Sequence, residues 1–469
     1  MFTSNPSMRI SSAVAVVAAL SSIAPAWANP VPKSELLVPP PEATHYIIVS
    51  DTNTHGDEWR WTTDEGAIAF RKSQSLRGWI TETDAVVTLD DDGDPLTLII
   101  RGVTPEGDAA ETLGSGPNGL YWDSGADRGQ APADSGFYLS RGGPQSMFGL
   151  LAERLVREGQ VDLLPTGTAT FQEGGTLTLD DDSGEIVARL ILIDGLQQAP
   201  IPVWVDTEGR HLASVSWMGL MREGVEGHYK TLKQYQEDAV SKNVENVATR
   251  FLTEDARAPL LVDNVRIFDA LNGQFIDNQA VAAADGRITA VGPAGTLSLP
   301  QGGRVIDGTG KTLVPGLWDA HKHFGNGNDL LANVAVGMTS IRSPGNGLEL
   351  LVSAKQDRAA GKMVAPEIFG AIIIDRDHPL SAQGASLVSS EAETIEAVRK
   401  AAENDLWGVK IYTSMNPDWI APAAAEAHRL GLNVLGHVPA TMRPIEAVRA
   451  GYDEVTHLNF IMMQALPQE

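Results

Sequence analysis

Short runs of alternating apolar and polar residues fill the chain up to about residue 253, and turn-forming residues separate most of them. Three pairs of runs predict hairpins: 85–89 with 96–100, 177–179 with 186–192, and 203–205 with 211–215. Apolar residues near helical spacing predict two helices, at about 146–157 and 229–251. The pattern therefore predicts an antiparallel β-rich domain that carries two helices.

Acidic residues crowd two of these turns, at Asp90–Gly93 and Asp180–Gly184. Clustered carboxylates suit a calcium ion. Asp and Gly are also the residues that tight turns use, and the helical frame and final Glu of an EF-hand are missing. We therefore interpret both segments as plain turns.

The pattern of predicted secondary structure changes after Pro259. A strand at 260–269 and a hairpin at 280–291, turning at Asp285-Gly286, come first. Strands and helices then alternate, which predicts βα units and a parallel sheet. The predicted strands are 313–318, 337–342, 368–374, 409–412, 433–437 and 454–457, and the predicted helices are 390–404, 417–430 and 444–450. A closed barrel has eight such units, so these units predict an incomplete (β/α)8 TIM barrel.

Composition narrows the class of protein. The chain has 469 residues, 43% of them hydrophobic and 20% charged, which is ordinary for soluble globular domains. The net charge of -25 disfavours a nucleic-acid partner or an anionic membrane surface, since both attract basic proteins. The chain contains no Cys, which excludes disulfides, Cys-ligated zinc and a cysteine nucleophile.

The N-terminus has the pattern of a secretory signal peptide. Arg9 precedes an apolar and small-residue run at Ser11–Ile23, and Ala26-Trp27-Ala28 provides a cleavage site. No later stretch approaches the roughly 20 apolar residues of a membrane span. We expect cleavage after Ala28 and a soluble periplasmic or secreted protein.

His321 and His323 stand at the end of the apolar segment 313–318. Side chains two apart on a strand share a face, so both imidazoles can bind one metal ion. The carboxyl ends of the strands are also where barrels of this kind place their sites. Neutral imidazole is a good ligand for zinc and similar ions.

The segment Leu313-Val-Pro-Gly-Leu-Trp-Asp-Ala-His-Lys-His323 resembles the entry pattern of the amidohydrolase superfamily. The resemblance covers about residues 259–469 and continues with Lys410 in Gly-Val-Lys-Ile-Tyr, His437 in Gly-His-Val-Pro and His457 in Val-Thr-His. These forms are most similar to the imidazolonepropionase-like and prolidase-like branch.

The resemblance implies a flanking small β-sandwich, begun by residues 256–312, and one or two divalent ions such as Zn²⁺. The ligands would be His321, His323, His437, His457 and Lys410, the last carbamylated and bridging. The implied reaction is hydrolysis of a carbon–nitrogen bond in a small amide or peptide-like substrate, by water activated at the metal. The family's proton-accepting Asp belongs to an eighth strand that this sequence does not reach, so no catalytic base is assigned. Lys410 could instead be a lysine that extends from a strand end into solvent.

Three further residues are candidates for substrate binding. Tyr412 follows Lys410 by two positions and should share its face, or else fill a barrel layer. His378 lies in the loop after the third strand, where it could contact substrate or only solvent. Arg342 ends the second strand, where it could clamp substrate or form an internal ion pair.

The predicted organisation is a signal peptide at 1–28, a β-rich domain at 29–255, the sandwich segment at 256–312 and the partial barrel at 313–469. Two other functions stay open. The chain could be a truncated, inactive product whose N-terminal β domain serves as a binding or scaffold module. It could also be a different barrel hydrolase, similar to phosphotriesterases. Either form could be a homo-oligomer.

Overall fold

A computed structural model describes residues 31–50, 53–76, 78–133, 135–181, 184–197, 199–216, 218–253, 258–299, 301–382 and 384–465. The expected signal peptide lies outside these residues. The chain divides into two compact units, Met1–Glu237 and Asp238–Glu469. The division falls inside a long helix, α3 (Tyr229–Phe251), whose bounds match the predicted helix.

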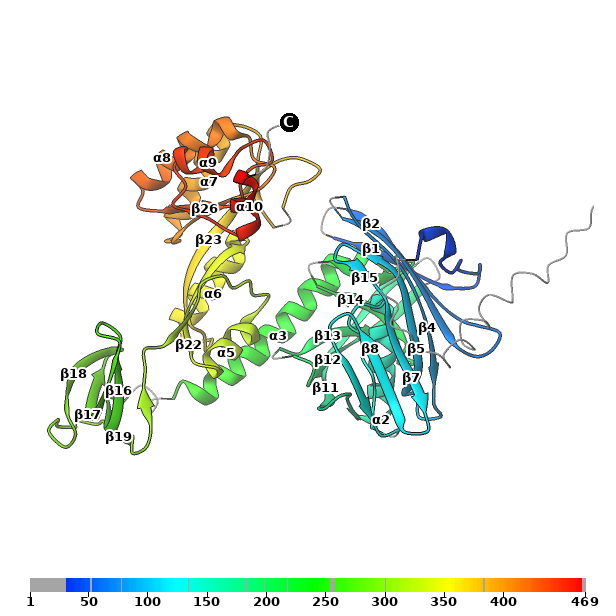
Figure 1. Ribbon diagram of the computed structural model, residues 1–469, viewed down its shortest axis with the longest axis horizontal. Helices are drawn as coiled ribbons and strands as arrows, with labels where there is room; N and C mark the ends of the chain where they lie inside the picture. Colours follow the sequence, from blue (N-terminus) through cyan, green and yellow to red (C-terminus); the bar gives the residue numbers. More distant parts are fainter. Residues whose placement is uncertain are drawn as a thin grey trace, which may run out of the picture. The chain divides into compact units, whose positions relative to one another are not determined.

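Unit 1 is built on one antiparallel sheet, which curves in Figure 1 (blue to green). Its order is β10-β11-β12-β13-β14-β15-β1-β2-β3-β4-β5-β7-β8-β9, with β6 paired to β5. The strands are β1 (Thr44–Val49), β2 (Thr54–Thr62), β3 (Ile68–Leu76), β4 (Trp79–Leu89), β5 (Pro95–Thr104), β6 (Gly107–Asp108), β7 (Glu111–Gly116), β8 (Gly119–Ser124), β9 (Arg128–Ala131), β10 (Gln160–Asp162), β11 (Thr168–Asp181), β12 (Gly184–Asp194), β13 (Ile201–Val205), β14 (His211–Val215) and β15 (Gly219–Arg222).

The three predicted hairpins are confirmed as β4–β5, β11–β12 and β13–β14, each antiparallel. The predicted first helix is α2 (Phe148–Glu158), preceded by the 3-10 turn η4 (Gln145–Met147). Its apolar face packs into the main core of unit 1, with Leu151 and Leu155 fully buried beside Phe70 and Ile100. The acidic turn at Asp90 is held by its own carboxylate, which accepts three backbone N–H groups within the turn.

Unit 2 begins with a small sheet in the order β18-β17-β16-β19, with β20 paired to β16. The strands are β16 (Leu260–Asp269), β17 (Gln274–Ala284), β18 (Arg287–Pro293), β19 (Arg304–Asp307) and β20 (Thr312–Leu313). The β17–β18 hairpin turns at Asp285-Gly286 as predicted, and both residues have positive φ. A small apolar cluster of Leu261, Ala280 and Ala282 packs on one face.

The rest of unit 2 is a curled parallel sheet, a half-barrel in the order β21-β22-β23-β25-β26-β27, with β24 beside β23. Its strands are β21 (Leu317–Asp319), β22 (Met338–Asn346), β23 (Glu367–Arg376), β24 (Ser386–Val388), β25 (Gly408–Ile411), β26 (Asn433–Gly436) and β27 (Glu454–Val455). The helical segments are α5 (Gly327–Ala335), α6 (Leu348–Ala359), α7 (Glu391–Glu403), η6 (Pro417–Trp419), α8 (Ile420–Arg429), α9 (Pro444–Arg449), α10 (Leu458–Met462) and η7 (Met463–Ala465), and α7, α8 and α9 gather together in Figure 1.

The first predicted barrel strand, 313–318, is wrong as one element. Leu313 ends β20 and pairs with the small sheet, whereas Leu317 begins β21 and pairs with β22. Pro315, which lacks an N–H, and Gly316 separate the two pieces. A Cβ on Gly316 would lie 1.9 Å from the Thr339 hydroxyl, so this close passage of the chain requires glycine.

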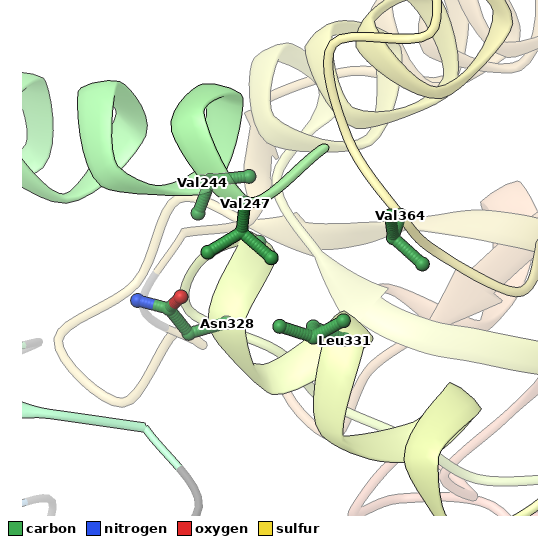
Figure 2. A pocket seen from close by; sticks show the side chains of 6 residues that line it. Val244, Val247, Asn328, Leu331 and Val364 are labelled. Carbon is green, nitrogen blue, oxygen red and sulfur yellow. The ribbon is translucent and has the colours of Figure 1, made fainter. Parts of the chain in front are cut away.

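The end of α3 packs on α5 within unit 2. Figure 2 shows Val244 and Val247 of α3 facing Leu331 of α5, with Val364 opposite. The seam leaves no room for a water molecule. Among the described residues, no helix is both long and apolar enough to cross a membrane.

Candidate active site

Four histidines meet at the carboxyl ends of the half-barrel strands. The ring centroid of His321 lies 5.2 Å from that of His323 and 4.9 Å from that of His457, and His457 lies 5.0 Å from His437. His321 follows β21, His437 follows β26 and His457 follows β27. Parallel strands bring their carboxyl ends to one edge, which is why residues over 130 positions apart gather here.

The closest pair is His321 and His323, whose Nε2 atoms lie 3.3 Å apart. Two imidazole nitrogens bound to one tetrahedral zinc ion at roughly 2.1 Å would lie about 3.4 Å apart. The donor type and this spacing fit a divalent ion. Within the described residues, however, no group of three or more His, Asp or Glu side chains is arranged to hold an ion. The geometry therefore fits two metal ligands, His321 and His323.

Three imidazoles of this cluster, those of His321, His323 and His457, have a lowered pKa and so favour their neutral form. Burial, with Lys410 as the next cause, lowers the pKa of His321 to about 4. The same two causes lower the pKa of His323 and His457. Neutral imidazole offers a lone pair, which is the form that binds metal ions.

Lys410 lies within β25 and is only 2% exposed. Its Nζ sits 5.6 Å from the centroid of the Tyr412 ring, so the two side chains share a face as predicted. Burial and the nearby Arg342 cation lower the pKa of Lys410 to about 8. This burial contradicts the alternative of a lysine that extends into solvent.

His437 is fixed from several directions. Its Nδ1 lies 2.9 Å from the Thr413 hydroxyl, and its main-chain carbonyl accepts the Tyr452 hydroxyl at 2.9 Å. The rings of Tyr412 and Phe460 lie 4.0 and 4.7 Å from it. The Thr413 contact therefore engages the Nδ1 side of the ring.

The protein comparisons point to one superfamily. Adenine deaminase 2 of Shouchella clausii is 43% identical over 64 residues, which are 14% of this chain and 11% of the relative. Imidazolonepropionase of Rhizobium rhizogenes is 43% identical over 68 residues, 14% of this chain and 17% of the relative. Enamidase of Eubacterium barkeri is 24% identical over 207 residues, 40% of this chain and 53% of the relative. The matched part of the chain is similar to enzymes of the amidohydrolase superfamily.

These relatives agree with the resemblance drawn from the His-Lys-His segment. The chain spans from about a tenth to about half of the length of these curated relatives. Among solved structures, a Xaa-Pro dipeptidase with bound methionine is 18% identical, with a TM-score of 0.37, over 44% of this chain and 65% of that one. No family model matches the chain.

The three predicted substrate contacts fall in different places. Tyr412 lies against His437 in the cluster. Arg342 forms a two-pronged ion pair with Glu454, at 2.5 and 2.8 Å, which is the internal alternative. The Nδ1 of His378 accepts the backbone N–H of Leu380, so this side chain forms a hydrogen bond within its own loop.

Several contacts of this histidine cluster were missed from the sequence. Thr413, Tyr452 and Phe460 surround His437, although none belongs to a metal-ligand motif. Gly345 passes so close to His323 that a Cβ there would lie 1.9 Å from the ring Cε1. The available signal was the glycine itself, since Gly345 comes at the end of a strand, where a close approach of backbone to a site requires glycine.

Proposed function

We propose that this chain is part of a metal-dependent amidohydrolase that cleaves carbon–nitrogen bonds in small amide or peptide-like molecules. One observation carries the proposal: His321, His323, His437 and His457 converge beside the buried Lys410 at the carboxyl edge of a parallel sheet. We further propose that the half-barrel forms the first six units of a (β/α)8 barrel.

The side chains fit the roles that this chemistry needs. The four imidazoles would supply neutral nitrogen ligands, and a lysine with a lowered pKa would supply an amine that can accept carbon dioxide and become an anionic ligand. A bound divalent ion would polarise a carbonyl and lower the pKa of water. Thr413 would hold the ring of His437 in place through its contact with Nδ1.

The names of the relatives support the bond class. Adenine deaminase and enamidase are named for reactions at carbon–nitrogen bonds, and imidazolonepropionase for a cyclic substrate. We propose a small amide or peptide-like substrate on this basis, and an exported enzyme on the basis of the signal pattern at residues 9–28. Mass spectrometry of the secreted protein would show whether cleavage occurs after Ala28.

Metal content provides the decisive test. The purified full chain should contain zinc or a similar ion in roughly stoichiometric amount by plasma mass spectrometry, and His323→Ala should lose it. His428→Ala is the matched control, since His428 pairs with Asp453 on the surface of a helix away from the cluster. Absence of metal from wild type, even after zinc is supplied during expression, would reject the proposal and favour a binding or scaffold role.

The substrate class needs a separate assay. Zinc-loaded protein should hydrolyse members of a panel of N-acyl dipeptides and cyclic amides, and it should be inactive on organophosphate triesters. Preference for the phosphotriesters would favour the other type of barrel hydrolase. Comparison with the His323→Ala variant controls for contaminating hydrolases.

A further inference from the structure

Arg342 contacts three segments of the candidate site: the one with His321 and His323, the one with His457, and the one with Lys410. It lies in β22, and its guanidinium donates through Nε to the Ala320 carbonyl at 2.7 Å. Its other two nitrogens donate to Glu454. The same group lies 5.4 Å from the ring of Trp407, the residue before the strand that carries Lys410.

Arg342 forms two hydrogen bonds with the His-Lys-His turn, one through its side chain and one through its main chain. The Arg342 side chain binds the carbonyl of Ala320, and the Arg342 main-chain carbonyl accepts the N–H of Lys322 at 2.9 Å. His321 is thus flanked by two hydrogen bonds to one residue. The direction of its side chain depends on this turn, because β21 ends at Asp319.

The second contact reaches the segment of His457. Glu454 begins β27, which is only two residues long and pairs with β26 at Leu435 and Gly436. One more main-chain hydrogen bond, from the Thr456 N–H to the Gly436 carbonyl at 2.9 Å, continues the pairing up to the residue before His457. The bidentate fork from Arg342 adds a rigid, directional link three residues before His457.

We propose that Arg342 is a positioning residue that sets the spacing between the first-strand histidines and His457, so that these side chains can share a metal ion. The proposal rests on the proposed function, since it assumes a metal at the cluster. It assigns Arg342 to the scaffold of the site rather than to substrate. Three of its N–H groups are already engaged, and its side chain is only 15% exposed.

Positioning and simple charge predict opposite effects on metal affinity. A cation near the cluster repels a divalent ion, so if charge alone mattered, removing it would strengthen binding. If Arg342 holds the ligands in place, removing it weakens binding despite that relief. Residues that orient metal ligands typically change metal affinity by about 10- to 100-fold when they are replaced.

The test measures zinc affinity by competition with a chromophoric chelator, using the full chain. Arg342→Gln and Arg342→Lys should each weaken zinc binding by about 10- to 100-fold, because lysine keeps the charge but cannot form the fork. Glu454→Gln keeps the shape of the side chain and weakens its end of the fork, and it provides a second route if the arginine variants do not fold. The double variant Arg342→Gln/Glu454→Gln should be no weaker than Arg342→Gln alone, because both act through one link.

Arg399→Gln is the matched control, since Arg399 forms an Arg–Glu pair with Glu426 on the helices. Its zinc affinity should equal that of wild type, while thermal unfolding of all variants reports general damage. Wild-type affinity, or tighter binding, in both Arg342 variants and in Glu454→Gln would overturn the positioning role. Failure of wild type to bind zinc would instead reject the proposed function.

Discussion

Lys72 in unit 1 and Lys410 in unit 2 are both buried strand lysines whose pKa is lowered mainly by burial, yet their neighbours have opposite charge. Lys72 is opposite Glu58 on the next strand, and that carboxylate raises its pKa against the effect of burial. Lys410 has the cation Arg342 nearby, which lowers its pKa further. The lysine of unit 1 therefore has its counter-charge within the fold, whereas the environment of Lys410 shifts its protonation equilibrium toward the neutral amine.

Two histidines repeat the contrast. Burial lowers the pKa of His211 in unit 1 to about 3, and its Nε2 is engaged by the Ser214 hydroxyl at 2.9 Å. His321 in unit 2 has a pKa of about 4, and its Nε2 faces the same atom of His323. The imidazole of His211 contacts a serine hydroxyl, whereas that of His321 lies against a second imidazole nitrogen. A lowered pKa alone does not distinguish a structural histidine from a functional one, but the group that contacts the ring does.

Removing Glu58 should produce the largest loss of stability. The Glu58 carboxylate is fully buried, accepts the backbone N–H groups of Gln145 and Ser146, and faces Lys72. Glu58→Ala leaves these groups unpaired, so the free energy of unfolding should fall by about 3–5 kcal/mol, measured in denaturant. Glu65→Ala, in an exposed turn, is the control and should change little.

The corresponding change in unit 2 sharpens the comparison. Lys410→Met removes a buried amine whose pKa no carboxylate of the described residues raises, so it should not destabilise the metal-free chain as Glu58→Ala does. A loss as large as that of Glu58→Ala would show that Lys410 is paired within the fold, and the contrast would be wrong.

The pH dependence of unit 1 should come next in size. Below pH 6.5 the unfolded chain protonates His211, while the folded chain keeps it neutral down to about pH 3. The unfolded state therefore binds more protons, and stability falls as the pH falls through this window. At pH 5 the contribution is on the order of 2 kcal/mol, at about 1.4 kcal/mol per pKa unit. His211→Gln should flatten this slope relative to wild type in denaturation series between pH 4 and pH 7, and an unchanged slope would contradict the buried neutral state.

The sequence predicted those parts of both units that depend on local pattern. Alternation and turn residues located the hairpins of unit 1, and the bounds of α3 agreed at both ends. The order of His321, Lys410, His437 and His457 along the chain identified side chains that do meet. Parallel strands explain this success, since a residue at a strand's carboxyl end has its place fixed by the sheet.

The missed features depend on contacts between distant segments. The short helices α5 and α6 and the strand β24 were not assigned, and 313–318 was taken as one strand although Pro315 and Gly316 divide it. The Arg342–Glu454 pair joins residues 112 positions apart, and no local pattern marks it. Thr413 is similar, because its role appears only when β26 places His437 beside it.

The third effect in size should come from Gly345. A methyl group there would overlap the His323 ring, so the ring must move. Gly345→Ala should weaken zinc binding by about 10- to 100-fold while thermal stability changes little. Gly347→Ala is a suitable neighbour control, since its added Cβ would meet only ordinary contacts, at 3.5 Å. Equal zinc affinity in both variants would show that zinc binding does not depend on the present position of the His323 ring.

The smallest effect should come from Thr413. Its hydroxyl lies 2.9 Å from Nδ1 of His437, and Thr413→Val keeps the shape while removing the hydrogen bond. A single hydrogen bond contributes about 0.5–1.5 kcal/mol, so zinc affinity should fall by about tenfold or less. Thr413→Ser keeps a hydroxyl and should retain affinity. If the valine and serine variants bind zinc equally, the Thr413 hydrogen bond is not what holds the ring of His437 for metal binding.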